Sequence, residues 1–305
     1  MGGAPVFSVE GDGIAEVWEK SLVLLWEKGT QIKTEYDKPT DPPAKDAAMV
    51  MVVRQPFAEP RIHLGFCGGI EDLEKYRQEV VDGVHDHWIA PEEGKWTYTY
   101  HRRLTDYLVT DDLSRRDPKK LPFKSVNQLD YIVRKLSERP YSRRAQGITW
   151  MPLSDPETDD PPCLQRVWCR LFPVGQTSLA SAKPGSGREE DGYNLQMHTH
   201  WRSRDAYRAA YMNIYGLTEL QKVLAAQIQD RLKRPVSVGS YVDITDSYHI
   251  YGSSFEDFKK RFLKLYRERI FFSPESGKGR TLRSDDSAVI AGIEYGKELL
   301  KAENG

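Results

Sequence analysis

The sequence predicts a protein of the α/β (or α+β) class, with a mixed β-sheet flanked by helices. Several segments carry apolar residues at helical spacing, and several shorter runs are rich in β-branched residues, which is typical of strands. These segments do not follow a strict strand–helix–strand alternation. The chain has 305 residues, 39% of them apolar, and we find no internal repeat or clear boundary. We therefore expect a single domain over residues 1–305, large enough to bury a sizeable core.

Composition limits the classes of function. The 44 Lys and Arg residues balance 45 Asp and Glu, so the chain lacks the positive field typical of nucleic-acid-binding proteins. No apolar run approaches the roughly 18 residues that span a bilayer. The first residues lack a basic segment followed by an apolar one, so we expect no secretory signal. Three cysteines without a C-x-x-C pair fit a reducing cytoplasm and argue against structural zinc.

The first half of the chain contains three predicted helices and one predicted strand. The first helix ends at Gly29, a natural C-cap, and Pro140 ends the third. One side of that third helix is apolar and should face the core. The helices are expected over 14–28, 70–84 and 125–140, the strand over 48–54, and the apolar side consists of Leu129, Ile132, Val133 and Leu136.

The second half is richer in strands. The helix over 216–233 has the clearest stripe at period 3.6, formed by Leu217, Leu220, Leu224, Ile228 and Leu232. In the next helix we expect Ser254 to act as N-cap and four aromatic residues to face inward. Strands are expected over 147–153, 165–172, 193–201 and 236–245, helices over 254–269 and 285–303, a flexible loop over 174–192, and the inward aromatic residues are Phe255, Phe258, Phe262 and Tyr266.

Cys163 lies in the stretch DDPPCLQRVWCRL, directly before a predicted strand. Taken alone, a buried thiol is the simpler interpretation, because cysteine is among the most buried residue types. Pro161 and Pro162 nevertheless impose an extended approach that could present the thiol for chemistry. Cys169 lies in the middle of the strand among apolar residues, and we expect it to be buried.

Two arginine clusters suggest an anion site. Arg143 and Arg144 follow a proline turn, and guanidinium groups suit phosphate oxygens. Arg202, Ser203 and Asp205 are expected where a strand gives way to a helix, and backbone N–H groups at such a junction favour anions. Because the chain has no GxxxxGK[ST] motif, the pattern indicates a nucleoside monophosphate and not a nucleoside triphosphatase.

Histidines form two further candidate groups. His198 and His200 alternate on one strand and should face the same way, and HDHW at 85–88 is a second cluster. Neither has the carboxylate or cysteine spacing of a metal site, so core or surface histidines are preferred and no metal is expected. His249 and Tyr251, in DSYHIYG, also share a face and could bind sugar hydroxyls.

In combination these motifs resemble the thymidylate synthase family. The segments DPPC, RSRD, YMN and HIYG follow in the order of that family's pattern and are preceded by SRR. The resemblance covers roughly residues 140–265 and is closer to the archaeal-type and nucleotide-hydroxymethylating branches than to the common bacterial enzymes. It implies the thymidylate synthase fold, a homodimer formed through the sheet, and methylenetetrahydrofolate as co-substrate.

The resemblance also implies a role for each matching residue. Cys163 matches the nucleophile that adds to C6 of a pyrimidine. Arg202 and Ser203 match phosphate ligands, and Arg143 and Arg144 match the pair that reaches the phosphate from the other subunit. The remaining matches are Asp205 near base and folate, Asn213 at the base edge, His249 and Tyr251 at the sugar, Glu59 and Tyr100 for proton transfer, and Trp88 or Trp96 as the active-site tryptophan beside the folate.

Addition of a thiolate at C6 makes C5 nucleophilic, so that C5 can attack the folate methylene group. Hydride transfer then gives a methyl group, whereas water gives a hydroxymethyl group. The family's histidine after the nucleophile is Leu164 here, its glutamine before R-S is Trp201, and the last residues, KAENG, are not an apolar lid. Methylation of dUMP is the first expectation. Hydroxymethylation of a UMP- or CMP-type nucleotide, and a non-catalytic nucleotide- or RNA-binding relative, stay open.

Overall fold

A computed structural model describes residues 3–109, 124–175 and 192–304. The chain divides into two compact units, each built from separate stretches of sequence. Unit 1 comprises Met1–Arg77, Trp201–Thr218 and Ser240–Gly305, and unit 2 comprises Gln78–His200 and Glu219–Gly239. The expectation of a single domain stays a prediction. Most of the predicted flexible loop over 174–192 lies outside the described residues.

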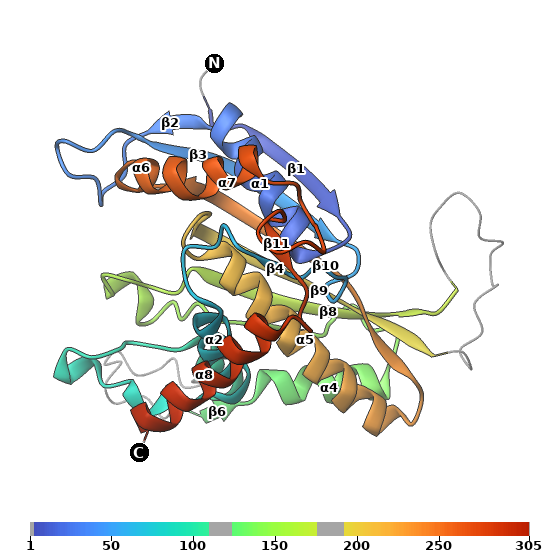
Figure 1. Ribbon diagram of the computed structural model, residues 1–305. Coiled ribbons are helices and arrows are strands. Elements are labelled where there is room, and N and C mark those ends of the chain that lie inside the picture. The colour runs from blue at the N-terminus through green and yellow to red at the C-terminus, as the bar shows by residue number, and fades with distance from the viewer. Residues whose placement is uncertain (1–2, 110–123, 176–191, 305) are drawn as a thin grey trace. The chain divides into compact units, whose positions relative to one another are not determined.

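Unit 1 contains a sheet in which β3 is the central strand. Strand β1 pairs with it in parallel, whereas β2 and β10 pair with it in antiparallel fashion, so the sheet is mixed as predicted. Helix α1 packs against β1 and β3 (Figure 1). The elements lying wholly in unit 1 are β1 (Val6–Gly11), α1 (Ile14–Lys28), β2 (Thr30–Ile32), β3 (Ala44–Val53), β4 (Ile62–His63), α6 (Phe255–Phe258), a π-helical turn (Lys259–Leu263), α7 (Lys264–Glu268), β11 (Thr281–Leu282) and α8 (Ser287–Asn304).

Unit 2 contains the strand order β9-β8-β7, with a separate β5–β6 pair. Helix α4 packs against β7 and β8. Its elements within the described residues are 3₁₀ turns at Asp86–Trp88, Pro91–Glu93 and Asp155–Glu157, α3 (Tyr100–Thr105), β5 (Tyr107–Val109), β6 (Lys124–Val126), α4 (Gln128–Glu138), β7 (Gln146–Ile148) and β8 (Leu164–Pro173). Four elements contribute residues to both units: α2 (Ile70–Asp82), β9 (Tyr193–Asp205), α5 (Ala210–Leu232) and β10 (Val236–Ile250).

Several predicted elements are confirmed with the reasons given for them. Helix α1 ends at Gly29, whose N–H bonds to the carbonyl of Leu25. Helix α4 begins after Asn127, whose side chain accepts a hydrogen bond from the N–H of Asp130, as an N-cap residue does. All four apolar residues predicted to face the core from α4 are buried. Strand β8 alternates buried and half-buried residues and buries Cys169 completely.

Other local predictions are wrong because long-range contacts decide the structure. Strand β7 ends at Ile148, so residues 149–153 are not a strand; the chain turns there toward Asp155. Ser254 does not cap the following helix, because its hydroxyl accepts a hydrogen bond from Arg208 Nε. Tyr266 is 37% exposed, since the π-helical turn adds a residue before α7 and rotates the stripe.

A buried ion pair lies at the centre of unit 1. Arg204, on β9, donates two hydrogen bonds to Asp243, on β10, and the two side chains are 1% and 0% exposed. Asp243 also accepts from Trp201 Nε1 at 3.1 Å and from the Tyr241 hydroxyl at 3.0 Å. Burial lowers the pKa of Arg204, but the charge of Asp243, the nearby Tyr248 and Tyr241, and the hydrogen bond to Asp243 together raise it above its ordinary value. Arg204 therefore stays charged inside the core.

Replacement of Asp243 by Asn should destabilise the protein strongly. The change removes the negative charge but leaves the Arg204 guanidinium buried, which typically costs about 3–5 kcal/mol. Urea unfolding, followed by circular dichroism, measures the loss. The matched control is Asp285→Asn, which breaks an exposed pair with Arg283 and should leave the midpoint almost unchanged. Equal effects of the two substitutions would contradict a structural role for the buried pair.

Candidate active site

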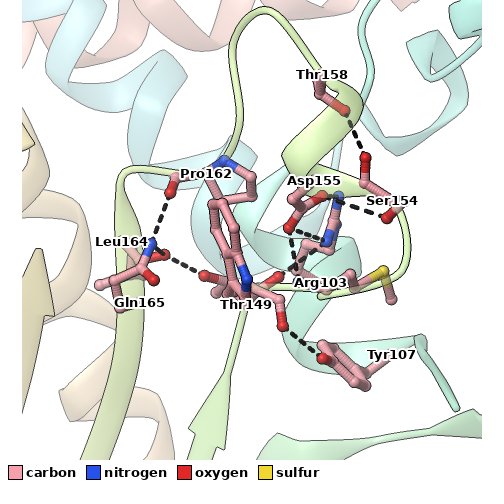
Figure 2. Close-up of polar contacts among 11 residues, drawn as sticks. Arg103, Tyr107, Thr149, Ser154, Asp155, Thr158, Pro162, Leu164 and Gln165 are labelled. Atoms are coloured by element: carbon pink, nitrogen blue, oxygen red, sulfur yellow. Dashed lines mark hydrogen bonds and ion pairs between the residues drawn. The ribbon is translucent and has the colours of Figure 1, made fainter. Parts of the chain in front are cut away.

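In unit 2, Cys163 is half-buried and directly precedes β8, as predicted. The carbonyl groups of Pro162 and Leu164, the residues on either side of Cys163, both accept hydrogen bonds (Figure 2). Gln165 Nε2 donates to the carbonyl of Pro162 at 2.7 Å, and Thr149 Oγ1 donates to the carbonyl of Leu164. The backbone on both sides of the thiol is thus fixed, which is the arrangement that a positioned nucleophile needs.

The segment that leads to Cys163 is tied to α3 and β5 (Figure 2). Arg103 donates to both carboxylate oxygens of Asp155, at 2.7 and 3.0 Å, and to the carbonyl of Thr149 at 2.9 Å. The Tyr107 hydroxyl donates to the carbonyl of Trp150 at 2.6 Å. Asp155 is only 1% exposed, so this bidentate pair anchors the turn between β7 and Cys163 firmly.

Tyr100, the tyrosine predicted for proton transfer, lies beside the backbone that follows Cys163 in unit 2. The N–H of Leu164, the residue after Cys163, lies 3.4 Å from the Tyr100 hydroxyl. Tyr100 also lines a cavity of about 370 Å³ together with Glu79, Trp96, Tyr98 and Asp160. Aromatic walls and two carboxylates at one cavity suit a flat, polar, heteroaromatic ligand.

Trp88 and Trp96, the two candidate tryptophans, contact each other directly, and both contact the ring of His85. The ring centroid of His85 lies 4.0 Å from that of Trp88 in a stacked arrangement, and Trp96 meets both rings edge-on. His85 Nδ1 hydrogen-bonds to Glu79 at 3.0 Å. Burial raises the pKa of Glu79 despite this hydrogen bond. The HDHW motif therefore belongs to an aromatic cluster.

The sequence analysis did not predict that Glu79, Asp86 and His101 form side-chain hydrogen bonds in this part of unit 2. Asp86 accepts a hydrogen bond from Thr99 and lies 2.6 Å from His101 Nδ1. Burial would raise the pKa of Asp86, but the hydrogen bonds from His101 and Thr99 lower it. The only sequence signal was the density of histidine and aspartate over residues 85–88, which does not name the partners.

Arg143 and Arg144 are exposed in unit 2, as an arginine pair available to an external ligand should be. Their backbone is fixed, because Trp168 Nε1 donates to the carbonyl of Arg143 at 3.0 Å and Tyr131 donates to that of Arg144 at 3.2 Å. The neighbouring strands β8 and β9 present a half-buried face, on which Trp168 and His198 contact each other at 4.8 Å between ring centroids.

In unit 1, Arg202 and Ser203 lie within β9 and not at the start of a helix. The strand continues to Asp205, and α5 begins only at Ala210. The predicted helix-terminus contribution to an anion site is therefore wrong for these two residues. Both are half-buried, whereas Trp201 and Arg204 on either side are buried. The burial alternation changes phase here, which brings two consecutive side chains out of the core.

Asp205 ends β9 and closes the turn that follows. Its Oδ1 accepts hydrogen bonds from the N–H groups of Tyr207, at 2.9 Å, and Arg208, at 2.8 Å. Burial nevertheless raises the pKa of its carboxyl group above the ordinary value. A carboxyl group that is harder to ionise than usual is a common feature of functional sites.

Asn213 and His249 are buried polar residues of unit 1. Asn213 Nδ2 donates to the Tyr76 hydroxyl at 2.7 Å. His249 Nδ1 lies 3.2 Å from the carbonyl of Ser247, so it carries the proton and leaves Nε2 as an acceptor. Nε2 is buried, and no residue in the described part of the chain hydrogen-bonds to it. Tyr251 contacts the His249 ring at 4.5 Å between ring centroids.

Glu59, the predicted proton-transfer glutamate, is exposed in unit 1. Its carboxylate accepts hydrogen bonds from the N–H groups of Arg61, at 2.9 Å, and Ser284, at 3.0 Å. Neither partner is among the predicted site residues, so its proton-transfer role stays a prediction.

Over residues 3–109, 124–175 and 192–304, no three or more His, Cys, Asp or Glu residues are grouped as metal ligands. In the same residues no helix is long and apolar enough to cross a membrane.

Comparison with known proteins identifies the family and the fold. A family profile described as thymidylate synthase matches residues 51–274. A putative thymidylate synthase of Methanosarcina acetivorans is 23% identical, over 81% of this chain and 91% of its own length. One of Methanothermobacter thermautotrophicus is 26% identical, over 82% and 96%. Thermostable thymidylate synthase A of Bacillus subtilis shares the fold, with a TM-score of 0.54 at 17% identity, over 86% of this chain and 87% of its own.

The fold and the family match therefore define a transferase of one-carbon units in nucleotide biosynthesis. The chain belongs to the thymidylate synthase family.

Replacement of Asp205 by Asn should stabilise the protein at neutral pH. When a carboxyl group has a higher pKa in the folded protein than its unfolded value of about 3.8, its ionisation lowers the free energy of unfolding. This loss of stability reaches its full size above the folded pKa. Asparagine removes the charge and keeps the acceptor oxygen, so the gain should be present at pH 7 and vanish below about pH 3.8. Thermal unfolding at several pH values measures it.

The control is Asp86→Asn, for which the opposite change in stability is expected, because the pKa of Asp86 is lowered. That change should destabilise the protein at pH 7. Loss of stability in both variants would contradict the electrostatic interpretation of Asp205.

Proposed function

We propose that this protein transfers a one-carbon unit from methylenetetrahydrofolate to C5 of a pyrimidine nucleoside monophosphate, and that the reaction is methylation of dUMP to dTMP. The observation that carries this proposal is the presentation of Cys163. The thiol precedes a strand between two hydrogen-bonded carbonyl groups, and the Tyr100 hydroxyl lies beside the next residue.

The chemistry assigns Cys163 the central step. Its thiolate adds to C6 of the pyrimidine, which turns C5 into a carbon nucleophile for the folate methylene group. The C5 proton is then removed, and Tyr100 is the proposed proton carrier because of its place beside the nucleophile. Loss of that proton breaks the bond between the methylene carbon and the folate nitrogen. Hydride transfer from the folate to this carbon would then give the methyl group and dihydrofolate, and release of the Cys163 thiolate from C6 completes the turnover. A thiolate nucleophile needs a reducing compartment, which supports a cytoplasmic location.

Unit 1 supplies the proposed nucleotide ligands. Arg202 and Ser203 emerge together from β9 and would bind the phosphate. His249 presents a buried Nε2 acceptor, which suits a sugar hydroxyl donor, and Tyr251 lies beside it. Asn213 offers an amide for the base edge, and Asp205 would lie near base and folate. An unmatched buried acceptor such as His249 Nε2 favours ligand binding over a purely structural role.

Trp88, Trp96 and the cavity in unit 2 support folate as co-substrate. Tyr98, Tyr100 and Trp96 line the cavity of about 370 Å³ and offer aromatic faces for a pterin ring. Glu79 and Asp160 at the same cavity are acceptors for ring N–H groups.

Hydroxymethylation at C5 is the second candidate function. Trp96, at the cavity wall, is 39% exposed, so water has access to one side of the proposed folate site. Water attack on the exocyclic methylene group would give a hydroxymethyl nucleotide in place of a methyl nucleotide.

One assay separates these outcomes. The protein is incubated with methylenetetrahydrofolate and, separately, with dUMP, UMP, dCMP and CMP, and each product is weighed by mass spectrometry. We expect a methyl mass gain on dUMP, with formation of dihydrofolate. A hydroxymethyl mass gain would establish the second candidate instead. Absence of turnover with all four nucleotides, despite binding, would indicate a non-catalytic relative.

Replacement of Cys163 by Ala should abolish turnover and preserve nucleotide binding, because the covalent step needs the thiol but the binding groups remain. The matched control is Cys169→Ala, since Cys169 is buried on β8 and burial raises the pKa of its thiol to about 12. Steady-state kinetics and calorimetric titration with dUMP measure the two properties. Full activity of the Cys163 variant would refute covalent catalysis by this residue.

A homodimer formed through the sheet is also part of the proposal. The outward faces of β8 and β9 in unit 2 carry half-buried aromatic side chains, among them Trp168 and Phe172, beside Arg170 and His198. Contiguous aromatic surface of this kind is typical of protein interfaces. Arg143 and Arg144, which are exposed and adjoin this face through Trp168, would then reach the phosphate of the partner subunit.

Mixing two inactive variants tests donation across the interface. If Arg143 and Arg144 act in the other subunit, the double variant Arg143→Ala/Arg144→Ala should regain activity when mixed with Cys163→Ala. Random exchange of subunits would give about half of the molecules as heterodimers with one intact site. Light scattering should show twice the chain mass of 35.0 kDa. Absence of recovery from a mixture that exchanges subunits would assign the arginines to their own subunit.

A further inference from the structure

Three hydrogen bonds in unit 2 form a ring that begins and ends on α3. Arg103 Nη1 donates to the carbonyl of Thr149 at 2.9 Å, and Thr149 Oγ1 donates to the carbonyl of Leu164 (Figure 2). The N–H of Leu164 donates to the Tyr100 hydroxyl at 3.4 Å. Tyr100 and Arg103 both belong to α3, so the helix itself closes the ring. Both polar groups of the Leu164 backbone are used in it.

The direction of each of these hydrogen bonds is fixed by the chemistry of its groups. A guanidinium or a backbone N–H group can only donate, and a carbonyl oxygen can only accept. The Thr149 hydroxyl must therefore donate to Leu164, and the Tyr100 oxygen must accept from the Leu164 N–H. The hydrogen of the Tyr100 hydroxyl consequently points away from Leu164, which leaves it for transfer to another group.

Helix α3 holds the two ends of the ring at a fixed spacing. Tyr100 and Arg103 are three residues apart, which places them on one side of the helix. Thr99 caps the helix, since its side chain accepts a hydrogen bond from the N–H of Arg102 at 3.0 Å and donates one to Asp86. The first turn of α3, which carries Tyr100, is therefore held in place.

The guanidinium of Arg103 is in turn held by Asp155. It donates to both carboxylate oxygens, at 2.7 and 3.0 Å, and the two side chains are 11% and 1% exposed. The same carboxylate accepts a hydrogen bond from the N–H of Met151 at 2.6 Å. Movement of the guanidinium would leave a buried carboxylate unpaired, which is strongly unfavourable. Arg103 therefore binds the chain at Thr149 and again at Asp155.

The ring affects Cys163 because Leu164 is the next residue. A displacement of Thr149 would carry the Leu164 carbonyl with it, and the Leu164 N–H would then move relative to Tyr100. The thiol and the Tyr100 hydroxyl would no longer keep the same separation. Reactions between positioned groups are sensitive to such a change, since a shift of about 1 Å can lower a rate about a hundredfold.

We propose that Arg103 is a positioning residue that sets the separation between the Cys163 thiol and the Tyr100 hydroxyl. It acts through the hydrogen-bonded ring and not on the substrate. The assignment rests on the proposed roles of Cys163 and Tyr100. It concerns removal of the C5 proton, because in that step the nucleotide is bonded to Cys163 and must meet Tyr100.

Arg103→Lys keeps the positive charge but replaces the planar fork by a single ammonium group, which cannot hold Asp155 and Thr149 in the same geometry. We expect kcat for dUMP to fall about 10- to 100-fold. KM should stay almost unchanged, because Arg103 is not among the proposed nucleotide ligands. The deuterium isotope effect on kcat, measured with dUMP deuterated at C5, should increase, since removal of the C5 hydrogen becomes slower. A loss of folded protein lowers kcat equally for both isotopic substrates and cancels from the isotope effect.

Three further variants separate positioning from a general loss of structure. Arg102→Lys is the matched control, because Arg102 is the neighbouring residue on α3 but forms an exposed pair with Asp106 at 3.4 Å. It should leave kcat and the isotope effect unchanged. Thr149→Val removes the hydroxyl and should reproduce the increase seen in Arg103→Lys, whereas Thr149→Ser keeps the hydroxyl and should resemble the wild type. Circular dichroism verifies that each variant is folded.

The failure of this assignment is distinguishable from failure of the proposed function. If the wild type turns over a nucleotide but the isotope effect is unchanged in Arg103→Lys, Arg103 does not position the two groups and the function stands. An increase in Arg103→Lys without one in Thr149→Val would overturn the path through the ring. If the wild type turns over none, the function fails, and hydrogen exchange of the Leu164 amide, measured by NMR, tests the ring. Faster exchange in Arg103→Lys than in Arg102→Lys supports it, and equal rates overturn it.

Discussion

The buried Arg204–Asp243 pair is the constraint on which the part of unit 1 that carries the proposed nucleotide ligands depends. A guanidinium and a carboxylate that are 1% and 0% exposed are stable only when their hydrogen bonds are satisfied, and here Trp201 and Tyr241 add donors to the same carboxylate. The pair therefore determines which side of β9 faces inward at Arg204. Since Arg204 must point into the core, Ser203 and Asp205 on either side of it cannot.

In both β9 and β10, the alternation of inward- and outward-facing side chains is interrupted where the proposed ligands lie. In β9 the change falls between Trp201 and Arg204. In β10 the register against β3 shifts between Thr245 and Tyr248, which is the mark of a β-bulge. Such an irregularity re-aims the side chains that follow it. Tyr248 then fills the core, and the next residue, His249, turns its ring to the other face. The proposed ligands Arg202, Ser203 and His249 therefore lie where these two strands are irregular.

The sequence predicted the regular part of this fold well, because that part depends on local periodicity. Helix α4 has its four apolar residues buried as expected, and Cys169 is buried on β8 as expected. The order of short motifs also predicted the family. The prediction that β9 gives way to a helix near Arg202 was wrong. Strand β9 continues to Asp205 because Arg204 pairs with the distant carboxylate of Asp243, and no local sequence pattern shows this pairing. Partners such as Glu79 for His85 were missed for the same reason.

In unit 2 the position of Cys163 depends mostly on residues outside any motif. Asp155 is held by Arg103, and the backbone after the thiol is held by Thr149, so three side chains determine where the chain enters β8. Leu164, which stands where relatives are expected to carry a histidine, contributes only backbone groups to this arrangement. In the proposed mechanism, proton transfer near Cys163 is therefore assigned to another side chain. Tyr100 is the proposed carrier, because its hydroxyl accepts a hydrogen bond from the Leu164 N–H at 3.4 Å and so lies beside the backbone that follows Cys163.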